Sequence, residues 1–311
     1  MAGLDRNWET KVLLIKSEVV TGTDPIPTVA DNAILAYNAA LTLDADEKTR
    51  SPDKGFFSAP EKTFTNKRFG LTFEVEVAGS GTAGTAPKIS PILLMAGMSE
   101  TIVALTSVEY KPVTGSTETA TFYLNIDGTL YKSSSCKASI KIDEAIDDYG
   151  KMTVTVVGFY LSPVDSPLLP GDFSGFIPPV DNTEKNTVMN INGINVDGVT
   201  FSYDQGNSNA LKQSTETKVI NNDDRQGTAD VSVWINEQSY FNPYPLFENH
   251  TKVPVFFEAG IVAGNIVRIT LPNAQLSAPQ VANLNGVAGY NISLTPHSTA
   301  AGDDEFSILL T

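Results

Sequence analysis

The sequence contains one cysteine, Cys136, and two histidines, His250 and His297, among its 311 residues. A single cysteine excludes a disulfide within the chain, and the two histidines lie at no spacing typical of a metal site. No apolar run is long enough to span a membrane or to form the core of a secretory signal. We therefore expect a protein without a disulfide, a metal centre or a membrane anchor.

Positive charge is also scarce. The 21 Lys and Arg residues are outnumbered by 36 Asp and Glu, which gives a net charge of -15. A protein that grips phosphate backbones needs a cluster of Lys and Arg, so tight nucleic-acid binding is not expected. A hydrophobic content of 41% with 18% charged residues is typical of a folded chain, and the length suffices for two domains of ordinary size.

One glycine-rich motif has the spacing of a dinucleotide-binding loop, in residues 79–84 (GSGTAG). That fingerprint requires a buried parallel strand before it and a helix that begins within it. Here residues 69–77 alternate as a half-exposed strand does, and Pro87 delays any helix. We interpret the motif as a flexible loop. With no other catalytic pattern in the sequence, we expect no cofactor and no enzymatic activity.

Alternation of apolar and polar residues predicts antiparallel strands along most of the chain. The clearest is 69–77, and the same period recurs in 120–126, 151–158 and 228–236. Asp127-Gly128 is typical of a tight hairpin turn. Short helical segments are predicted at 89–98 and 242–247. The predicted fold is all-β, with two tandem antiparallel β-sandwich or open-barrel domains that each carry one short helix or helix-like segment.

Prolines and glycines divide the chain into two parts. Residues 166–185 form the predicted linker, because they are dense in residues that break regular structure. The first domain is then 1–165, which begins with an extended arm, and the second is 186–311. The second half loosely repeats the first, since 190–203 and 228–236 follow the pattern of 33–43 and 69–77. Two polar segments, 44–66 and the one around 221–224, are expected to be equivalent loops, and 101–110 is expected to be one strand.

Two separated stretches resemble a known family. The first is TKVLLIKSEVVTGTDPIPTVADNAILAYN at 10–38, and the second comprises FYLNIDGTLYK at 122–132 with YGKMTVTVVGFYLSPVDSPLLP at 149–170. Both are similar to tail tube proteins of bacteriophages with long, non-contractile tails (siphovirus type). The two stretches occur in the family's order and at similar spacing, and they cover roughly the first 170 residues. The remainder of the chain is interpreted from its own pattern.

The resemblance implies a structural role in a virion. Domains of this type set their sheets side by side around a hollow axis, so that three two-domain chains would form a ring with six domain positions. Rings that stack head to tail form an open filament, here a conduit for DNA delivery into the host. The implied partners are further copies of the chain and other tail proteins at the tube ends. In the lumen, the tape measure protein and passing DNA would be contacted without tight binding. The implied location is the phage tail, after synthesis in the host cytoplasm.

Two sets of candidate site residues follow from this interpretation. For contacts between rings we select Asp24 and Pro25 in the N-terminal arm and Phe56 and Phe57 in the first long loop, since exposed aromatics mark contact surfaces. For the tube lumen we select the polar residues in phase opposite to the core: Glu74, Glu76, Asn125, Asp127, Asp230 and Ser232. An acidic lumen would repel DNA and offer it no binding well. The alternative is that these charges face outward and only solubilise the chain.

A second hypothesis is a virion or surface β-sandwich protein that binds a carbohydrate or another host ligand. Exposed aromatic side chains would supply stacking platforms in this case, with Tyr110, Tyr131, Trp234 and Tyr244 as candidates. The two hypotheses differ in self-assembly, because only the first requires rings.

Overall fold

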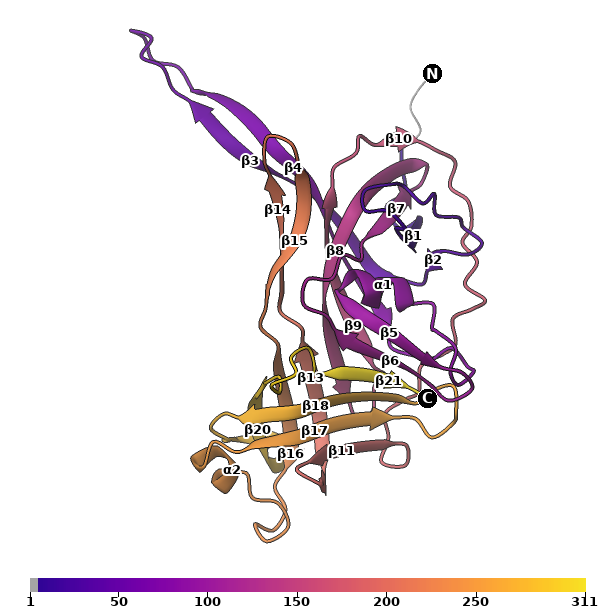
Figure 1. Cartoon of the computed structure of the whole chain (residues 1–311), viewed down its shortest axis with the longest axis vertical. Coiled ribbons are helices and arrows are strands. Elements are labelled where there is room, and N and C mark those ends of the chain that lie inside the picture. The colour runs from indigo at the N-terminus through magenta and orange to yellow at the C-terminus, as the bar shows by residue number, and fades with distance from the viewer. Residues whose placement is uncertain (1–4) are drawn as a thin grey trace.

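The computed structural model describes residues 5–311, and almost all of its regular structure is β (Figure 1). Strands account for 53% and helices for 4%, which confirms the predicted all-β fold. The two short helices are α1 (Ser90–Met95) and α2 (Tyr244–Glu248), close to the predicted positions. No helix among the described residues is long and apolar enough to cross a membrane.

One open antiparallel sheet, called here the long sheet, runs through both halves of the chain. Its order is β3-β4-β9-β8 from the first half, followed by β13-β16-β20-β19 from the second. Its strands are β3 (Tyr37–Arg50), β4 (Glu61–Glu76), β8 (Thr129–Ala145), β9 (Lys151–Phe159), β13 (Gly198–Asp204), β16 (Thr228–Trp234), β19 (Gln280–Leu284) and β20 (Val287–Pro296). The pairing of β8 with β13 therefore joins the two halves through backbone hydrogen bonds.

A covering layer packs on one face of the long sheet. Seven of its strands pair in the order β12-β11-β17-β18-β21-β6-β5. They are β5 (Met98–Val103), β6 (Ser107–Pro112), β11 (Thr187–Ile191), β12 (Ile194–Val196), β17 (Lys252–Ala259), β18 (Val267–Leu276) and β21 (Ser307–Leu310). The others lie around the N-terminal half of β8 and are β1 (Lys11–Ser17), β2 (Ala33–Ile34), β7 (Ala120–Ile126) and β10 (Val164–Asp165). Because β21 pairs with β6, the halves are joined a second time.

A single hydrophobic core lies between the layers and continues from one half to the other. On β4, Phe73 and its alternate neighbours point into it, as the period of two predicts. Across the layers, Phe201 of β13 stacks on Phe257 of β17 with ring centroids 5.6 Å apart. Each large apolar side chain buried in this way contributes roughly 1.5–3 kcal/mol to stability.

The hairpin predicted at Asp127-Gly128 is confirmed, and its strands β7 and β8 form a three-stranded antiparallel meander with β9. Asp127 (φ 43°) and Gly128 (φ 93°) both have positive φ, as a two-residue type I′ turn requires. The stretch 101–110 was predicted to be one strand and is instead split between β5 and β6. Leu105, with φ 59°, lies in the turn that reverses the chain there.

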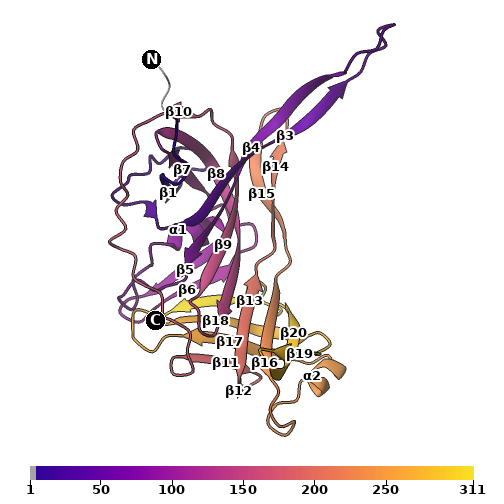
Figure 2. The same cartoon turned by 180° about the vertical axis from the view of Figure 1, so that it is seen from behind.

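Two segments expected to be loops are instead two-stranded arms. Most of 44–66 lies in β3 and β4, which extend far beyond the body of the molecule (Figures 1 and 2). Residues 221–224 lie in a shorter arm, formed by β14 (Asn207–Gln213) and β15 (Lys218–Arg225). The expectation was wrong because a ribbon that is exposed on both faces has no apolar alternation, so its polar sequence looks like that of a loop.

Residues 166–185 are extended and contain no helix or strand. They run along the body and are held to it near their end, where the backbone of Asn182 pairs with the β8–β9 turn. Asp147 N donates to Asn182 O (2.9 Å), and Asn182 N donates to Asp148 O (2.8 Å).

Candidate functional site

The face of the long sheet opposite to the core is polar and continues across both halves. One cross-strand row follows the pairing register through Glu76, Lys151, Asp143, Ser202, Asp230 and Ser293. Residues directly opposite one another on antiparallel strands point to the same face. The row therefore extends without interruption from β4 in the first half to β20 in the second. We call this surface the polar face.

Four of the residues predicted for the lumen lie together on the polar face. Glu76 and Asp230 belong to the row described above, and Glu74 is two positions from Glu76 on the same strand. Ser232 pairs with Thr200 on one side and with Asn291 on the other, two positions along from Asp230. Strand periodicity predicted the orientation of these side chains. The pairing of β8 with β13 brings the two residues of the first half and the two of the second half onto one surface.

Hydrogen bonds fix the carboxylates of the polar face. Tyr37 Oη donates to Glu76 Oε1 (2.8 Å), and this bond raises the pKa of Tyr37 to about 12. Asn38 Nδ2 donates to Glu74 Oε2 (3.2 Å), and Ser293 Oγ donates to Asp230 Oδ1 (2.5 Å). The acidic groups are thus held against the sheet by neighbours on adjacent strands.

The polar face has an excess of negative charge. A second row, next to the first, passes through Glu74, Thr153, Lys141, Asp204 and Thr228. The two rows together contain five carboxylates and two lysines, and their other residues carry hydroxyl groups. Lys141 is paired with Asp143 at 2.8 Å, and Lys151 with Asp148 at 3.0 Å, so neither lysine is a free cation. Such a surface repels a polyanion over a Debye length of about 8–10 Å.

Asn125 and Asp127 do not belong to the polar face, which corrects their assignment to it. They lie on β7 and its turn, in the covering layer. Asn125 is buried; its Nδ2 donates to Ser166 O (3.1 Å), and its Oδ1 accepts from Gly128 N (2.8 Å). Asp127 Oδ2 accepts from Asn7 N (2.7 Å). Asn125 therefore stabilises the turn, and Asp127 holds the N-terminal segment against it. The alternation of a single strand gives the phase of its side chains but not the layer to which the strand belongs.

The four residues predicted for contacts between rings lie in two different places. Asp24 is held by its own half, since it accepts hydrogen bonds from Tyr123 Oη and from Ile26 N (2.8 Å). Pro25 O accepts from Lys16 Nζ (3.0 Å). Phe56 and Phe57, in contrast, are exposed at the tip of the β3–β4 arm. Of these four predicted residues, the two at the arm tip present large apolar side chains to solvent.

The chemistry of the described residues gives no support to a catalytic or metal site. Cys136 is buried, and this burial raises the pKa of its thiol to about 12, so a reactive thiolate is not formed at neutral pH. Across residues 5–311, no group of three or more His, Cys, Asp or Glu side chains is placed to hold a metal ion.

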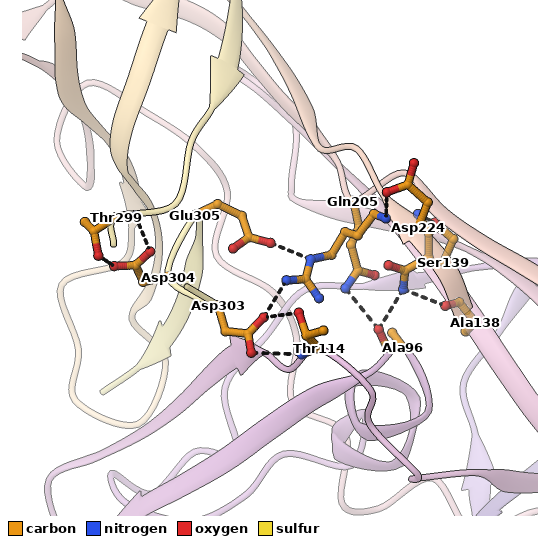
Figure 3. A network of polar contacts seen from close by, with 12 residues as sticks. Ala96, Thr114, Ala138, Ser139, Gln205, Asp224, Thr299, Asp303, Asp304 and Glu305 are labelled. Carbon is orange, nitrogen blue, oxygen red and sulfur yellow. Dashed lines mark hydrogen bonds and ion pairs between the residues drawn. The ribbon is translucent and has the colours of Figure 1, made fainter. Parts of the chain in front are cut away.

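The junction between the halves contains polar contacts that the sequence did not reveal. Arg225 at the base of the shorter arm pairs with Glu305 and with Asp303 (2.9 Å), and Thr114 N donates to Asp303 (2.9 Å) (Figure 3). Gln205 Nε2 donates to Ala96 O (3.0 Å). These contacts join segments more than 75 positions apart, so no local pattern identifies them. The bonds of Thr114 to Asp303 and of Gln205 to Ala96 cross between the halves, and Arg225 holds the Asp303 segment in place within the second half.

Glu144 is a buried carboxyl group at the same junction. It lies on β8 opposite Phe201 of β13, and its Oε2 accepts a hydrogen bond from Asn182 Nδ2 (2.8 Å). Burial raises the pKa of Glu144 to about 7, and the nearby Asp143 and Asp148 act in the same direction.

No known protein-family model matches the chain, and no curated protein matches it.

Proposed function

We propose that this protein is a structural subunit of a phage tail tube, which acts by assembly and without catalysis. The observation that supports this most is the long sheet. It consists of two four-stranded modules, β3-β4-β9-β8 and β13-β16-β20-β19, placed side by side with one unbroken polar face. A sheet that is covered on one face and polar on the other is suited to line an aqueous channel.

In the proposed assembly, three copies set their modules around an axis to give a ring with six module positions. The polar face lines the bore and the covering layer lies outside. Glu74, Glu76 and Asp230 then give the bore an acidic surface that DNA passes without being held. The exposed β3–β4 arm with Phe56 and Phe57 contacts the next ring, and head-to-tail stacking of rings forms the tube. Its place is the tail of the virion, where terminal tail proteins and the tape measure protein are the further partners.

The alternative, binding of a carbohydrate or host ligand, has less support. Tyr110, one of its four expected stacking platforms, is fully buried, and its Oη donates to Glu100 Oε1 (2.6 Å). Trp234 and Tyr244 are exposed, but Tyr244 packs edge-on against Tyr290. The expectation of an exposed Tyr110 was wrong because its strand, β6, is covered on the core side.

Negative-stain electron microscopy of the concentrated protein tests the proposal. We expect rings or tubes whose yield rises with protein concentration. Single particles at every concentration, together with a monomeric mass in sedimentation, would contradict the tail-tube proposal. Retention on a glycan array by such a monomer would then favour the alternative.

A further inference from the structure

The first two strands of each module, β3 and β4 in one and β13 and β16 in the other, are related by a constant offset in sequence. The register between β3 and β4 shifts between Tyr37 and Ala40 and again after Asp44↔Arg68. The register between β13 and β16 likewise shifts between Gly198 and Thr200, and the pairing ends at Asp204↔Thr228. Asp204 and Thr228 lie 160 positions after Asp44 and Arg68. The segments between them, which form the two arms, are therefore equal in length. The offset identifies equivalent positions in the two modules.

For the other two strands of each module the offset in sequence differs, and equivalent positions are found through the pairing register instead. In the second module, Val281 of β19 is connected to Val233 through β20. In the first module, Phe73 is the counterpart of Val233 and is connected to Ile140 of β8 through β9. Val281 is thus the counterpart of Ile140, and β19 is the counterpart of β8.

The two modules meet inside the chain at an edge-to-edge junction of β8 with β13. The ladder runs from Lys141↔Asp204 to Ala145↔Thr200, and Gln205 N donates to Ile140 O (3.0 Å) at its end. The outer edges of the long sheet have no such partner. Among residues 5–311, β3 pairs only with β4, and β19 only with β20.

Side chains at these two free edges are exposed where their counterparts at the internal junction are buried. Leu43 is 57% exposed, and its counterpart Tyr203 is 0% exposed. Val281 is 67% exposed, and its counterpart Ile140 is 1% exposed. An unpaired strand edge with exposed apolar side chains is a template for pairing with another chain. Each free edge lacks a partner strand within the described part of the chain, and the opposite free edge of a second copy would supply one.

We infer that β3 of one copy pairs antiparallel with β19 of the next in the register of the internal junction. Transferring that register places Asp44 opposite Ala282, Leu43 opposite Asn283 and Thr42 opposite Leu284. Beyond them, Ala45 N donates to Val281 O, as Gln205 N does to Ile140 O. The partner is thus a second copy of this chain, joined head to tail. This inference rests on the proposed ring assembly and adds the residue-level register of its subunit contact.

Disulfide cross-linking tests the register. Because Gln205 and Ile140 are hydrogen-bonded partners, the next pair along is a non-hydrogen-bonded pair, with Cα atoms about 4.5 Å apart. In the transferred register, Asp44 and Ala282 also form a non-hydrogen-bonded pair. Their Cα–Cα distance then suits a disulfide. The test variant is Asp44→Cys with Ala282→Cys. The matched control is Asp44→Cys with Gln280→Cys, which is on the same face but displaced by two residues, at roughly 7–8 Å.

A cross-link within one chain is excluded by distance. The edges β3 and β19 are separated by the width of the eight-stranded long sheet, roughly 33 Å at about 4.8 Å per strand. Cys136 is buried and is retained in all variants. The assembled protein is oxidised mildly, free thiols are blocked before denaturation, and the products are separated without reductant. A second pair, Thr42→Cys with Leu284→Cys, tests the same register if the first variant does not fold.

We expect covalent trimers from the 44/282 or 42/284 pair, with at least a tenfold lower yield from the 44/280 control. Electron microscopy of the same samples separates the two proposals. If tubes form but only the control pair cross-links, or no pair does, the register is overturned and the proposed function stays intact. Single particles without cross-links in the variants and in the unmodified chain would overturn both.

Discussion

Replacement of Glu144 by Gln should stabilise the subunit in a way that depends on pH. Glu144 is a buried residue of β8, opposite Phe201 of β13 and beside Asn182, and burial raises its pKa from 4.5 to about 7. The charged form is therefore disfavoured in the folded chain relative to the unfolded chain. Gln keeps the shape and the acceptor for Asn182 Nδ2 but cannot ionise, so it removes this penalty.

Proton linkage gives the direction in which the folding stability changes with pH. Below pH 4.5 the carboxyl group is protonated in both states, and the wild-type chain bears no penalty. Between pH 4.5 and about 7 the unfolded chain releases its proton more readily, so the folding stability of the wild type falls. A difference of about 2.5 pKa units corresponds to about 3 kcal/mol. The variant should match the wild type at pH 4 and exceed it by up to about 3 kcal/mol at pH 8.

Urea unfolding of the dispersed subunit, followed by tryptophan fluorescence from pH 4 to pH 9, measures this difference. The control is Glu216→Gln at the exposed tip of the shorter arm, for which we expect no pH-dependent gain. A Glu144→Gln effect that is the same at every pH would refute the argument, because it would show that packing and not ionisation determines the change.

Three further predictions concern assembly, DNA passage and the linker. Replacement of both Phe56 and Phe57 by Ser should abolish tubes in electron microscopy and leave urea unfolding unchanged, because both side chains are exposed in the isolated subunit and each contributes roughly 1.5–3 kcal/mol only when buried in a contact. Val219→Ser on the shorter arm is the control, and normal tubes from the double Phe variant would show that the arm tip is not the contact. Reversal of Glu74 and Glu76 to Lys should slow genome release from otherwise normal tubes, most at low salt, because these residues would then attract DNA; release equal to wild type at every ionic strength would place them outside the bore. A protease cut within residues 166–185 should leave the particle at its native size in gel filtration, since the β8–β13 and β6–β21 pairings still join the halves. Free halves released without denaturant would contradict the joint sheet.

Local sequence pattern identified much of the fold correctly. The alternation along 69–77 placed Phe73 in the core and Glu74 and Glu76 on the opposite face, because the side-chain period of a strand is a local property. Asp127-Gly128 identified its turn, since few residue pairs adopt two successive positive φ angles. The exposed aromatic pair Phe56-Phe57 was also recognised as a surface feature, although its segment was expected to be a loop.

The amino-acid sequence by itself determined the all-β class, the phase of the strands with one buried face and the acidic charge. Tertiary structure alone decided which strands share a sheet. It placed Asp230 in the same row as Glu76, moved Asn125 to the covering layer and turned the polar segment around 221–224 into an arm. The physical reason is that side-chain alternation reports only whether one face of a strand is buried. The pairing of β8 with β13, and the free edges at β3 and β19, depend on packing between segments far apart in the chain.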